Sequence, residues 1–344
     1  MRTSCVLIAG LIGFAECAAA MPSASKPTVP VATFSIVARD PVTGEIGVAV
    51  QSHWFSVGSV VPWAEAGVGA VATQSFVEPS YGPLGLDLMR KGTAPEAALK
   101  ELLAKDEHPD VRQVAFVDAK GRAAAHTGEH CIPGAGHHVG HGYTTEANLM
   151  LTAEVPDAMA KAFEAAKGPL AERMLAALEA AQGVGGDIRG KQSAAILVVR
   201  GTPTPKPWTD RLVDLRVEDH PEPLQELRRI LTLHRAYEKM NDGDDATAAG
   251  KMDVALREYG GAQAMVPGND EFVFWTAVAL VSNGRTDEAL PMFAKAFRMN
   301  PSWMLLVPRL PGVGQLPATQ GLTAKILAVG PAADLKATVP AANP

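Results

Sequence analysis

Residues 33–44 read TFSIVARDPVTG, and residues 46–52 read IGVAVQS. In the first stretch Phe34, Ile36 and Ala38 alternate with side chains of the other face, and the second stretch repeats this alternation. Alternation with a period of two is typical of a β-strand, and a short connection containing Pro and Gly joins two strands into a hairpin. We therefore expect an antiparallel strand pair whose first residue is Thr33.

The pattern of strands and helices continues to residue 218. We expect a strand of small residues at 67–74, suited to packing on both faces, and a strongly apolar strand at 193–199. The other expected strands are 111–117, 123–126 and 212–217, and the expected helices are 84–90, 95–104, 155–166 and 170–181, with a Gly- and His-rich loop at 128–142. This order predicts an α+β domain over residues 33–218, with two facing sheets and helices outside.

After a boundary at residues 219–223, the chain repeats itself with a period of 34 residues. The repeated positions are Gly250, Ala255, Tyr259, Ala262 and Pro267, which recur as Gly284, Ala289, Phe293, Ala296 and Pro301. This pattern resembles tetratricopeptide repeats, so we expect helical repeats over 224–311, with first helices at 224–240 and 271–283. Residues 312–344 should form a cap and a flexible tail. Because two repeats are too few to stand alone, they should dock on the first domain, on another copy of the chain or on a protein partner.

The first 20 residues have the pattern of a secretory signal peptide. Arg2 supplies a positive charge, residues 5–15 carry no charge, and Ala18–Ala20 place small residues before a cleavage site. The apolar run is shorter than the ~20 residues of a membrane-spanning helix. We therefore expect a periplasmic or secreted protein, without membrane attachment after signal removal. Residues 21–32, rich in Pro, Ser and Ala, would form a pro-segment.

Charge and metal-ligand patterns narrow the class of partner. The 31 Lys and Arg against 37 Asp and Glu give a net charge of −6, which argues against a nucleic-acid-binding surface. Five histidines between residues 126 and 141, with Cys131 among them, are potential zinc ligands. Their spacing fits no familiar zinc motif, so we expect no metal and no other cofactor. The alternative, a metal-dependent hydrolase using this loop, would require stoichiometric zinc.

Several motifs occur together in one order. They are TFSIVARD at 33–40, GVAVQS at 47–52, GVGAVATQ at 67–74, PSYGP at 79–83, HTG at 126–128 and GDIRG at 186–190. With these motifs, residues 33–218 resemble the bacterial DUF1028 family, which is placed in the N-terminal nucleophile (Ntn) hydrolase superfamily. The resemblance implies a four-layer αββα sandwich and a nucleophile at the first residue of the mature chain. Thr33 occupies the matching position, and the family supplies no settled substrate.

Thr33 could carry amide hydrolysis if the bond before it is cleaved. Its hydroxyl would attack the amide carbonyl, and its own α-amine would take the proton. The ordinary pKa of an α-amine, about 7.7–8.0, leaves a useful neutral fraction near pH 7. A signal-peptidase cut after Ala20 leaves residues 21–32 in front of Thr33, so a second cleavage, by the chain itself or by another protease, is required. The structural alternative is a β-branched residue that simply opens a strand.

Other polar residues are candidate partners of Thr33. Ser52 and His53 end the second strand, and a glycine-rich loop carries Asp187 and Arg189, which could supply oxyanion donors or a carboxylate clamp. These residues also have structural alternatives. Asp187 and Arg189 could form an ion pair with each other, and Glu78, in the loop after the strand at 67–74, could be a solvated acid. The full candidate set is Thr33, Ser52, His53, Asp187 and Arg189 for catalysis, and Gln51, Glu78, Gln192 and Ser193 for substrate binding.

The sequence thus favours an exported Ntn-type amidohydrolase that acts on a small amide or peptide-like substrate. A C-terminal helical module would serve docking or the formation of homo-oligomers. The alternative is a catalytically inactive Ntn fold that binds a ligand or a protein through its repeats.

Overall fold

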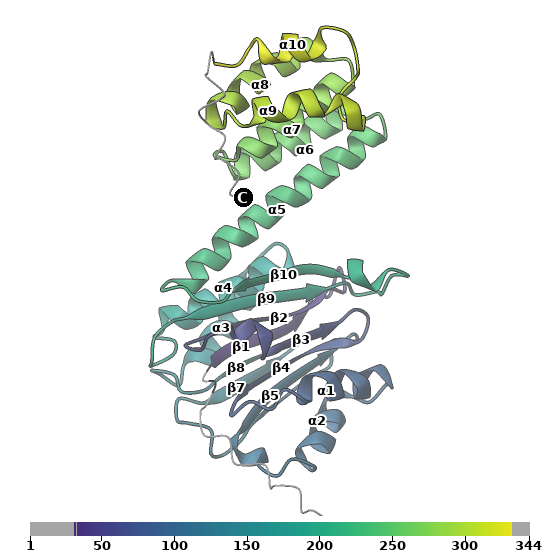
Figure 1. The fold of residues 1–344 in the computed structure, drawn as a ribbon. Coiled ribbons are helices and arrows are strands. Elements are labelled where there is room, and N and C mark those ends of the chain that lie inside the picture. The colour runs from purple at the N-terminus through teal and green to yellow at the C-terminus, as the bar shows by residue number, and fades with distance from the viewer. Residues whose placement is uncertain (1–30, 32, 332–344) are drawn as a thin grey trace, which may run out of the picture.

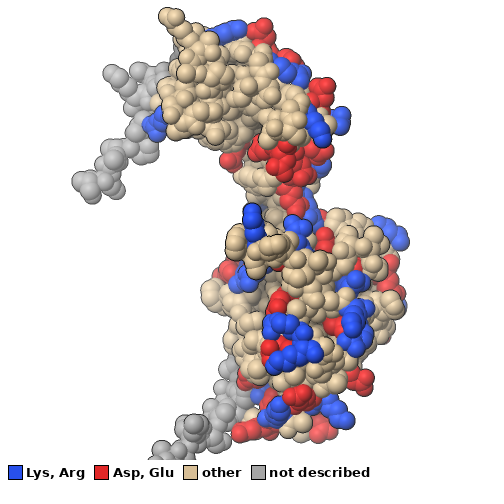
Figure 2. Space-filling model, turned by 90° about the vertical axis from the view of Figure 1, so that its right-hand side faces the viewer, with Lys and Arg blue, Asp and Glu red and all other residues tan. Residues whose placement is uncertain are grey.

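The computed structural model describes Val31 and residues 33–331, in which two antiparallel sheets with flanking helices are followed by a helical C-terminal part (Figure 1). The mixed α+β class and the C-terminal helical region agree with the prediction. The expected signal peptide, nearly all of the pro-segment and the end of the tail lie outside the described residues. Figure 2 shows acidic and basic side chains intermingled over the sheet-containing part, with the helical part beyond a narrower neck.

The larger sheet contains the predicted hairpin at its centre. Its strand order is β10-β9-β2-β1-β8-β7. Its strands are β1 Thr33–Arg39, β2 Ile46–Ser52, β7 Gly136–Gly140, β8 Tyr143–Ala147, β9 Ser193–Val199 and β10 Arg211–Val217. In the hairpin, Thr33 pairs with Ser52, and β1 pairs with β8 on its other side. Thr33 is therefore the first residue of a strand that has neighbours on both sides.

The smaller sheet faces the larger one. Its order is β3-β4-β5-β6, and its strands are β3 Pro62–Glu65, β4 Gly69–Ser75, β5 Arg112–Asp118 and β6 Ala123–Thr127. Between the sheets lies a core of aliphatic side chains, among them Val37 and Val48 from one sheet and Ala72 and Ala115 from the other. Because side chains alternate along a strand, the same faces of β1, β4 and β5 also direct Thr33, Gln74 and Gln113 between the sheets.

Helix pairs cover the outer faces of both sheets (Figure 1). These helices are α1 Tyr81–Arg90 and α2 Pro95–Leu103 on the smaller sheet, and α3 Val155–Ala165 and α4 Leu170–Gly183 on the larger one. Pro95 stands at the start of α2, where its missing N–H leaves no helical hydrogen bond unmade. Gly85 lets α1 approach the sheet closely, since a Cβ there would lie 2.5 Å from the Phe116 ring.

Three strands differ from the sequence prediction. The segment 128–142, expected to be a loop, contains the edge strand β7, and the strands β8 and β3 were not predicted. The residues of β7 have no apolar alternation, because this edge strand carries Gly and His. Those of β8 are fully buried although four of its five side chains are polar or amphipathic. Glu146 contacts Ser35 of β1, and Tyr143 and Thr145 donate to Glu164 and the Pro156 carbonyl of α3, partners that a search for apolar periodicity does not detect.

The C-terminal part consists of antiparallel helix pairs. Its main helices are α5 Pro223–Ala248, α6 Met252–Met265, α7 Asp270–Ser282 and α8 Thr286–Met299, with α9 Trp303–Leu306 and α10 Leu322–Leu327 as a cap. Tyr259 and Phe293, the aromatic residues of the 34-residue repeat, are buried in the two helical cores. Helix α5 extends beyond the predicted end at Met240, and its Arg228 pairs with Glu179 of α4. The helical part thus begins against the larger sheet itself, where the start of α5 packs on β9 and β10 beside α4.

Short 3-10 helices occupy several connections. They are η1 Val57–Ser59, η2 Pro109–Val111, η3 Pro207–Thr209, η4 Val307–Arg309 and η5 Pro311–Val313. Among the residues described, no helix is both long and apolar enough to cross a bilayer.

Candidate functional site

Thr33 lies fully buried between the two sheets, at the beginning of β1. Its Oγ1 is 2.8 Å from the carbonyl oxygen of Val31 and 3.2 Å from Ser52 Oγ. Its carbonyl oxygen accepts the backbone N–H of Asn148 at 3.1 Å and the Gln74 side-chain amide at 3.4 Å. The hydroxyl and the carbonyl are therefore both held by partners from neighbouring strands, so Thr33 has a fixed geometry.

Val31 is paired with the smaller sheet, whereas Thr33 belongs to the larger one. The backbone N–H of Val31 donates to Ser75 O at 2.6 Å, and that of Ser75 donates to Val31 O at 3.1 Å. The Val31 side chain is buried in the core between the sheets. Val31 therefore pairs like a strand residue with the end of β4, and this bridge closes the space between the sheets at the end where Thr33 lies.

A layer of polar side chains continues from Thr33 into the interior. Ser35, two residues further on the same face, lies 2.7 Å from Gln74 Oε1 and 2.9 Å from Glu146 Oε2. Gln74 Nε2 donates to Gln113 Oε1 at 2.7 Å, and Asn148 Nδ2 donates to the same oxygen at 2.9 Å. All five side chains are buried. The amide contacts fix which atom of each side chain is donor and which is acceptor, so the layer has one defined hydrogen-bond pattern.

Glu146 is the only carboxylic acid of this layer among the residues described. Burial raises the pKa of Glu146 to about 7, although the Ser35 hydroxyl favours the charged form. No cation contributes to its electrostatic surroundings among the described residues. A carboxyl group with this pKa exchanges a proton near neutrality, which is the range in which acid–base chemistry at Thr33 would operate.

Two strained backbone positions flank the same layer. Ser75, the pairing partner of Val31, has φ 68°, and Leu149, which follows Asn148, has φ 59°. Residues with a side chain adopt this left-handed conformation at a cost of order 1–3 kcal/mol, and such positions concentrate at functional sites. The strain therefore marks the end of the sandwich at Thr33 as a candidate site, independently of the residue types.

The loop that carries Asp187 and Arg189 is fastened to the end of β2. The buried carboxylate of Asp187 accepts the backbone N–H of His53 at 3.1 Å and that of Arg189 at 2.9 Å. It also pairs with the Arg189 guanidinium, at 2.8 Å between Oδ2 and Nη2. The ion pair considered as the structural alternative is therefore present. It anchors the loop directly next to Ser52, while the His53 side chain is exposed.

Ser193 and Gln192 lie beside Ser52 on β9 and the segment before it. Ser193 pairs with Ser52 across the strands, and its Oγ donates to Trp54 O and accepts the backbone N–H of Val57. The backbone N–H of Gln192 donates to Ser52 O at 3.1 Å. In this structure both residues hold the turn that follows β2, close to but not in contact with the Thr33 hydroxyl.

Gln51 and Glu78 lie apart from Thr33. Gln51 is the cross-strand neighbour of Phe34, and its side chain lies on the sheet face that packs against α3 and α4. Its buried amide has no hydrogen-bond partner among the described residues. Glu78 lies at the start of α1, on the outer side of the smaller sheet, where it lines a cleft. The structure therefore does not bring either side chain to the Thr33 hydroxyl.

Four of the five histidines between residues 126 and 141 each have a different partner. His130 contacts Asp110, His138 contacts Asp157, His137 contacts Thr127, and His126 contacts the Pro109 carbonyl. Within the described residues, no three side chains of the types His, Cys, Asp and Glu form a group that could hold a metal ion. The nearby Cys131 is buried, and burial raises the pKa of its thiol.

Comparison with known proteins identifies the family. Residues 33–227 match the model of DUF1028, a family of unknown function. The chain belongs to this family. A crystal structure of SPO2555, a DUF1028 protein from Silicibacter pomeroyi, is similar to this chain, with 32% sequence identity and a TM-score of 0.52. The similarity covers 61% of this chain and 89% of that chain. No curated protein sequence matches the chain.

Sequence reasoning missed the polar layer behind Thr33. Its members are Ser35, Gln74, Gln113, Glu146 and Asn148. A signal was nevertheless present, because Gln74 and Gln113 occupy positions whose neighbours two residues away, Ala72 and Ala115, are core residues. An amide at such a position points between the sheets and needs a buried partner. The identity of that partner depends on which strands face each other, and this information is not local to any segment.

Proposed function

We propose that this DUF1028 protein is an amide hydrolase of the Ntn type, with Thr33 as its nucleophile after cleavage of the Ala32–Thr33 bond. The observation that supports this most directly is the position of Thr33. It opens a central strand, it is held by Ser52 and Asn148, and it stands at the end of a buried polar layer between two facing sheets. The helix–sheet–sheet–helix arrangement is the architecture that the Ntn superfamily implies.

In the cleaved form, Thr33 would provide both the nucleophile and the base. Its Oγ1 attacks the carbonyl carbon of an amide, and the proton of the hydroxyl passes to the α-amine. When the C–N bond breaks, the same proton goes to the leaving nitrogen, and an ester joins Oγ1 to the acyl group. Water then hydrolyses this ester by the reverse proton path. Atoms and charges balance without a cofactor.

The surrounding residues have supporting roles in this proposal. Ser52 Oγ, 3.2 Å from Thr33 Oγ1, orients the hydroxyl. Asp187 fixes the backbone N–H groups of His53 and Arg189 beside the end of β2. Because these two N–H groups already donate to Asp187, their role is to hold the loop beside the end of β2. Within this loop, we retain the Arg189 side chain as the candidate for contacting an acidic group of the substrate. His53, Gln192 and Ser193 border this region, and we retain them as candidate substrate contacts.

The segment before Thr33 would act as a plug. The backbone pairing of Val31 with Ser75 and the burial of the Val31 side chain close the space in front of Thr33. Cleavage before Thr33 would produce the α-amine, and departure of the segment would open this space to a substrate. A single cleavage would thus create the base and open the site.

Export and the helical module complete the proposal. The signal-like leader would direct the protein to the periplasm or outside the cell, where amide or peptide-like substrates would meet it.

The repeats of tetratricopeptide type in α5–α8 would bind a protein partner or a second copy of the chain. The family match ends at residue 227 and leaves most of these helices uncovered, so the module would be a specialisation of this chain.

The deciding experiment is the intact mass and the N-terminal residue of the exported protein, followed by a screen against peptide and small-amide substrates. We expect a chain that begins at Thr33 and hydrolyses an amide. A chain that keeps the residues before Thr33 and shows no activity would instead support a ligand- or protein-binding module. The complete burial of Thr33 in this structure is the observation that favours that second function.

A further inference from the structure

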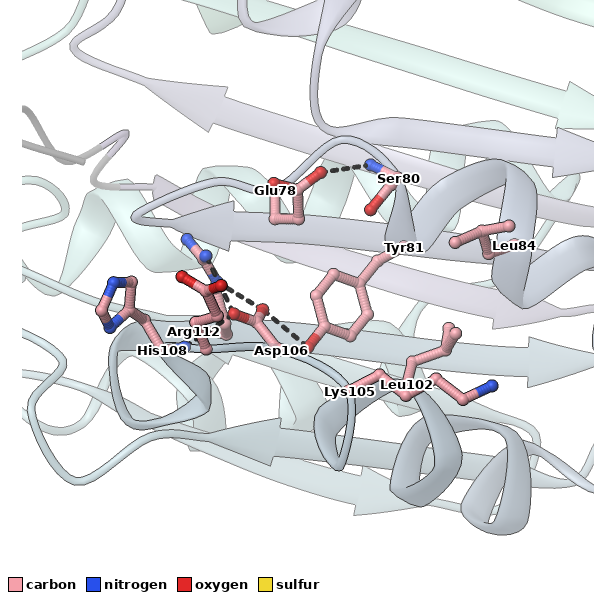
Figure 3. A pocket seen from close by; sticks show the side chains of 10 residues that line it. Glu78, Ser80, Tyr81, Leu84, Leu102, Lys105, Asp106, His108 and Arg112 are labelled. Carbon is pink, nitrogen blue, oxygen red and sulfur yellow. Dashed lines mark hydrogen bonds and ion pairs between the residues drawn. The ribbon is translucent and has the colours of Figure 1, made fainter. Parts of the chain in front are cut away.

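A cleft of about 410 Å³ opens on the outer side of the smaller sheet. It lies between the beginning of α1 and the segment that leads from α2 into β5, as Figure 3 shows. Its volume is in the range of small-molecule sites. Thr33, in contrast, faces the space between the sheets, so this cleft is a separate site.

The floor of the cleft is rigid and charge-balanced. Arg112 and Asp106 form a buried ion pair with two contacts, Nε–Oδ2 at 2.7 Å and Nη2–Oδ1 at 3.1 Å. The Tyr81 hydroxyl donates to Asp106 Oδ2 at 3.0 Å, and Arg112 Nη1 donates to Phe76 O at 2.6 Å. Burial alone would raise the pKa of Asp106, but the hydrogen bonds from Arg112 and other donors hold it below the usual range. Asp106 and Arg112 therefore neutralise each other.

The other charged groups of the lining are one cation, Lys105, and two carboxylates, Glu78 and Glu107. Lys105 pairs with Glu101 on α2, at 2.8 Å. Glu78 and Glu107 also line the cleft, and neither has a cationic partner among the described ion pairs. The Glu78 carboxylate is held in place by the backbone N–H of Ser80, which donates to its Oε1 at 3.0 Å. A ligand that complements these two carboxylates must carry positive charge.

The other walls of the cleft are apolar. Leu84 of α1 and Leu102 of α2 line it together with the ring of Tyr81, which Figure 3 shows reaching from the start of α1 toward Asp106. Leu84 is 49% exposed, which is high for a large aliphatic side chain beside a cleft. Tyr81 and Leu102 are themselves buried, so an apolar chain lying here would mainly remove Leu84 from water.

We propose that this cleft binds an organic ammonium ion with an apolar chain. The ammonium group lies at Glu78 and Glu107, and the chain lies along Tyr81, Leu84 and Leu102. Both parts are needed for specificity. The carboxylates exclude anions of the same shape, and the apolar wall distinguishes the ligand from small inorganic cations.

Calorimetric titration of the full-length protein with four probes tests this proposal. The probes are hexylammonium, methylammonium, 1-hexanol and hexanoate. We expect saturable binding of hexylammonium below about 10 mM, at least tenfold weaker binding of methylammonium and of hexanol, and no binding of hexanoate. Equal binding of hexanol or hexanoate, or no saturation with hexylammonium, would overturn the proposal.

Two variants locate the ligand, and one serves as the control. Glu78→Gln should weaken hexylammonium binding at least fivefold, whereas Glu129→Gln, which removes an exposed loop carboxylate elsewhere, should leave it unchanged. Leu84→Ser, at an exposed position, should weaken hexylammonium binding but not that of methylammonium. If Glu78→Gln binds as tightly as Glu129→Gln, the ligand lies elsewhere and the assignment is wrong. Because the measurement requires no turnover, its result is independent of whether Thr33 is a nucleophile.

Discussion

The hydroxyl of Ser35 lies 2.9 Å from the carboxyl group of Glu146, within a buried layer between the two sheets. The same hydroxyl lies 2.7 Å from Gln74 Oε1. One hydroxyl proton cannot serve two acceptors. If Glu146 is neutral, its Oε2–H donates to Ser35 and the Ser35 hydroxyl donates to Gln74, so that both contacts of Ser35 are satisfied. Glu146 Oε1 has no hydrogen-bond partner among the described residues. The geometry and the raised pKa of Glu146 therefore indicate the same protonated state.

The first prediction concerns stability against pH. The folded-state pKa of Glu146 is about 7, against 4.5 for an exposed glutamate. Between these two values the unfolded chain releases the proton while the folded chain keeps it, so stability falls as pH rises and stays low above pH 7. The shift corresponds to about 3 kcal/mol. Glu146→Gln should remove this fall, as measured by denaturant unfolding at pH 5 and pH 8.

The measurement compares the pH dependence of stability of the native chain with that of Glu146→Gln. All other titrating groups are present in both proteins, so their contributions cancel. Gln has nearly the same shape as protonated Glu and can donate to Ser35 in the same way. An identical loss of stability between pH 5 and pH 8 in both proteins would show that Glu146 is not the group responsible.

The second prediction concerns the nucleophile. Thr33→Ala removes the hydroxyl, so under the proposed mechanism amide hydrolysis should fall by about 10³-fold or more. Thr33→Ser keeps a hydroxyl at the same place and should retain measurable activity and the same N-terminal residue. Initial rates and intact masses of the three proteins provide the measurement. Activity of Thr33→Ala equal to that of the native chain would exclude Thr33 as the nucleophile.

The third prediction concerns the loop at Asp187. Asp187→Asn keeps the shape of the side chain but removes the carboxylate that pairs with the Arg189 guanidinium. It also weakens the hydrogen bonds that this side chain accepts from the backbone N–H groups of His53 and Arg189. Because the Arg189 charge that is left is 27% exposed, the loss comes mainly from the weakened buried hydrogen bonds, which cost roughly 1–3 kcal/mol. We expect a loss in this range, or a large increase in hydrogen exchange over residues 186–190.

The matched control for Asp187 is an exposed ion pair. Glu65→Gln removes the partner of Arg90, whose side chain is 47% exposed, and should change stability by less than about 1 kcal/mol. Equal effects of the two substitutions would contradict the importance assigned to burial of Asp187.

The fourth prediction concerns the contact of α1 with the smaller sheet. A Cβ at Gly85 would lie 2.5 Å from the ring of Phe116, so Gly85→Ala should destabilise the protein by about 1–3 kcal/mol through overpacking. Gly183→Ala, at the end of α4, meets no atom within 4 Å and should be neutral or slightly stabilising. Thermal unfolding of the two variants, followed side by side, distinguishes a packing effect from a general effect of removing glycine.

The sequence by itself determined the hairpin of β1 and β2, the helix pairs, the strand at 193–199 and the helical C-terminal region. Each rests on a local pattern, because the period of apolar residues, the turn residues and the helix-starting prolines act within a few positions of one another. The sequence also singled out Thr33 and the residues of the motifs around it.

Only the tertiary structure decided what surrounds Thr33. The strand β8 and its residue Glu146 became visible as part of the site once β8 was placed next to β1, more than 100 positions away in the chain. The same holds for Gln74 and Gln113, which come from the opposite sheet. Their polar side chains lack the apolar periodicity that marks a strand, and their burial becomes favourable only when two sheets bring hydrogen-bond partners together.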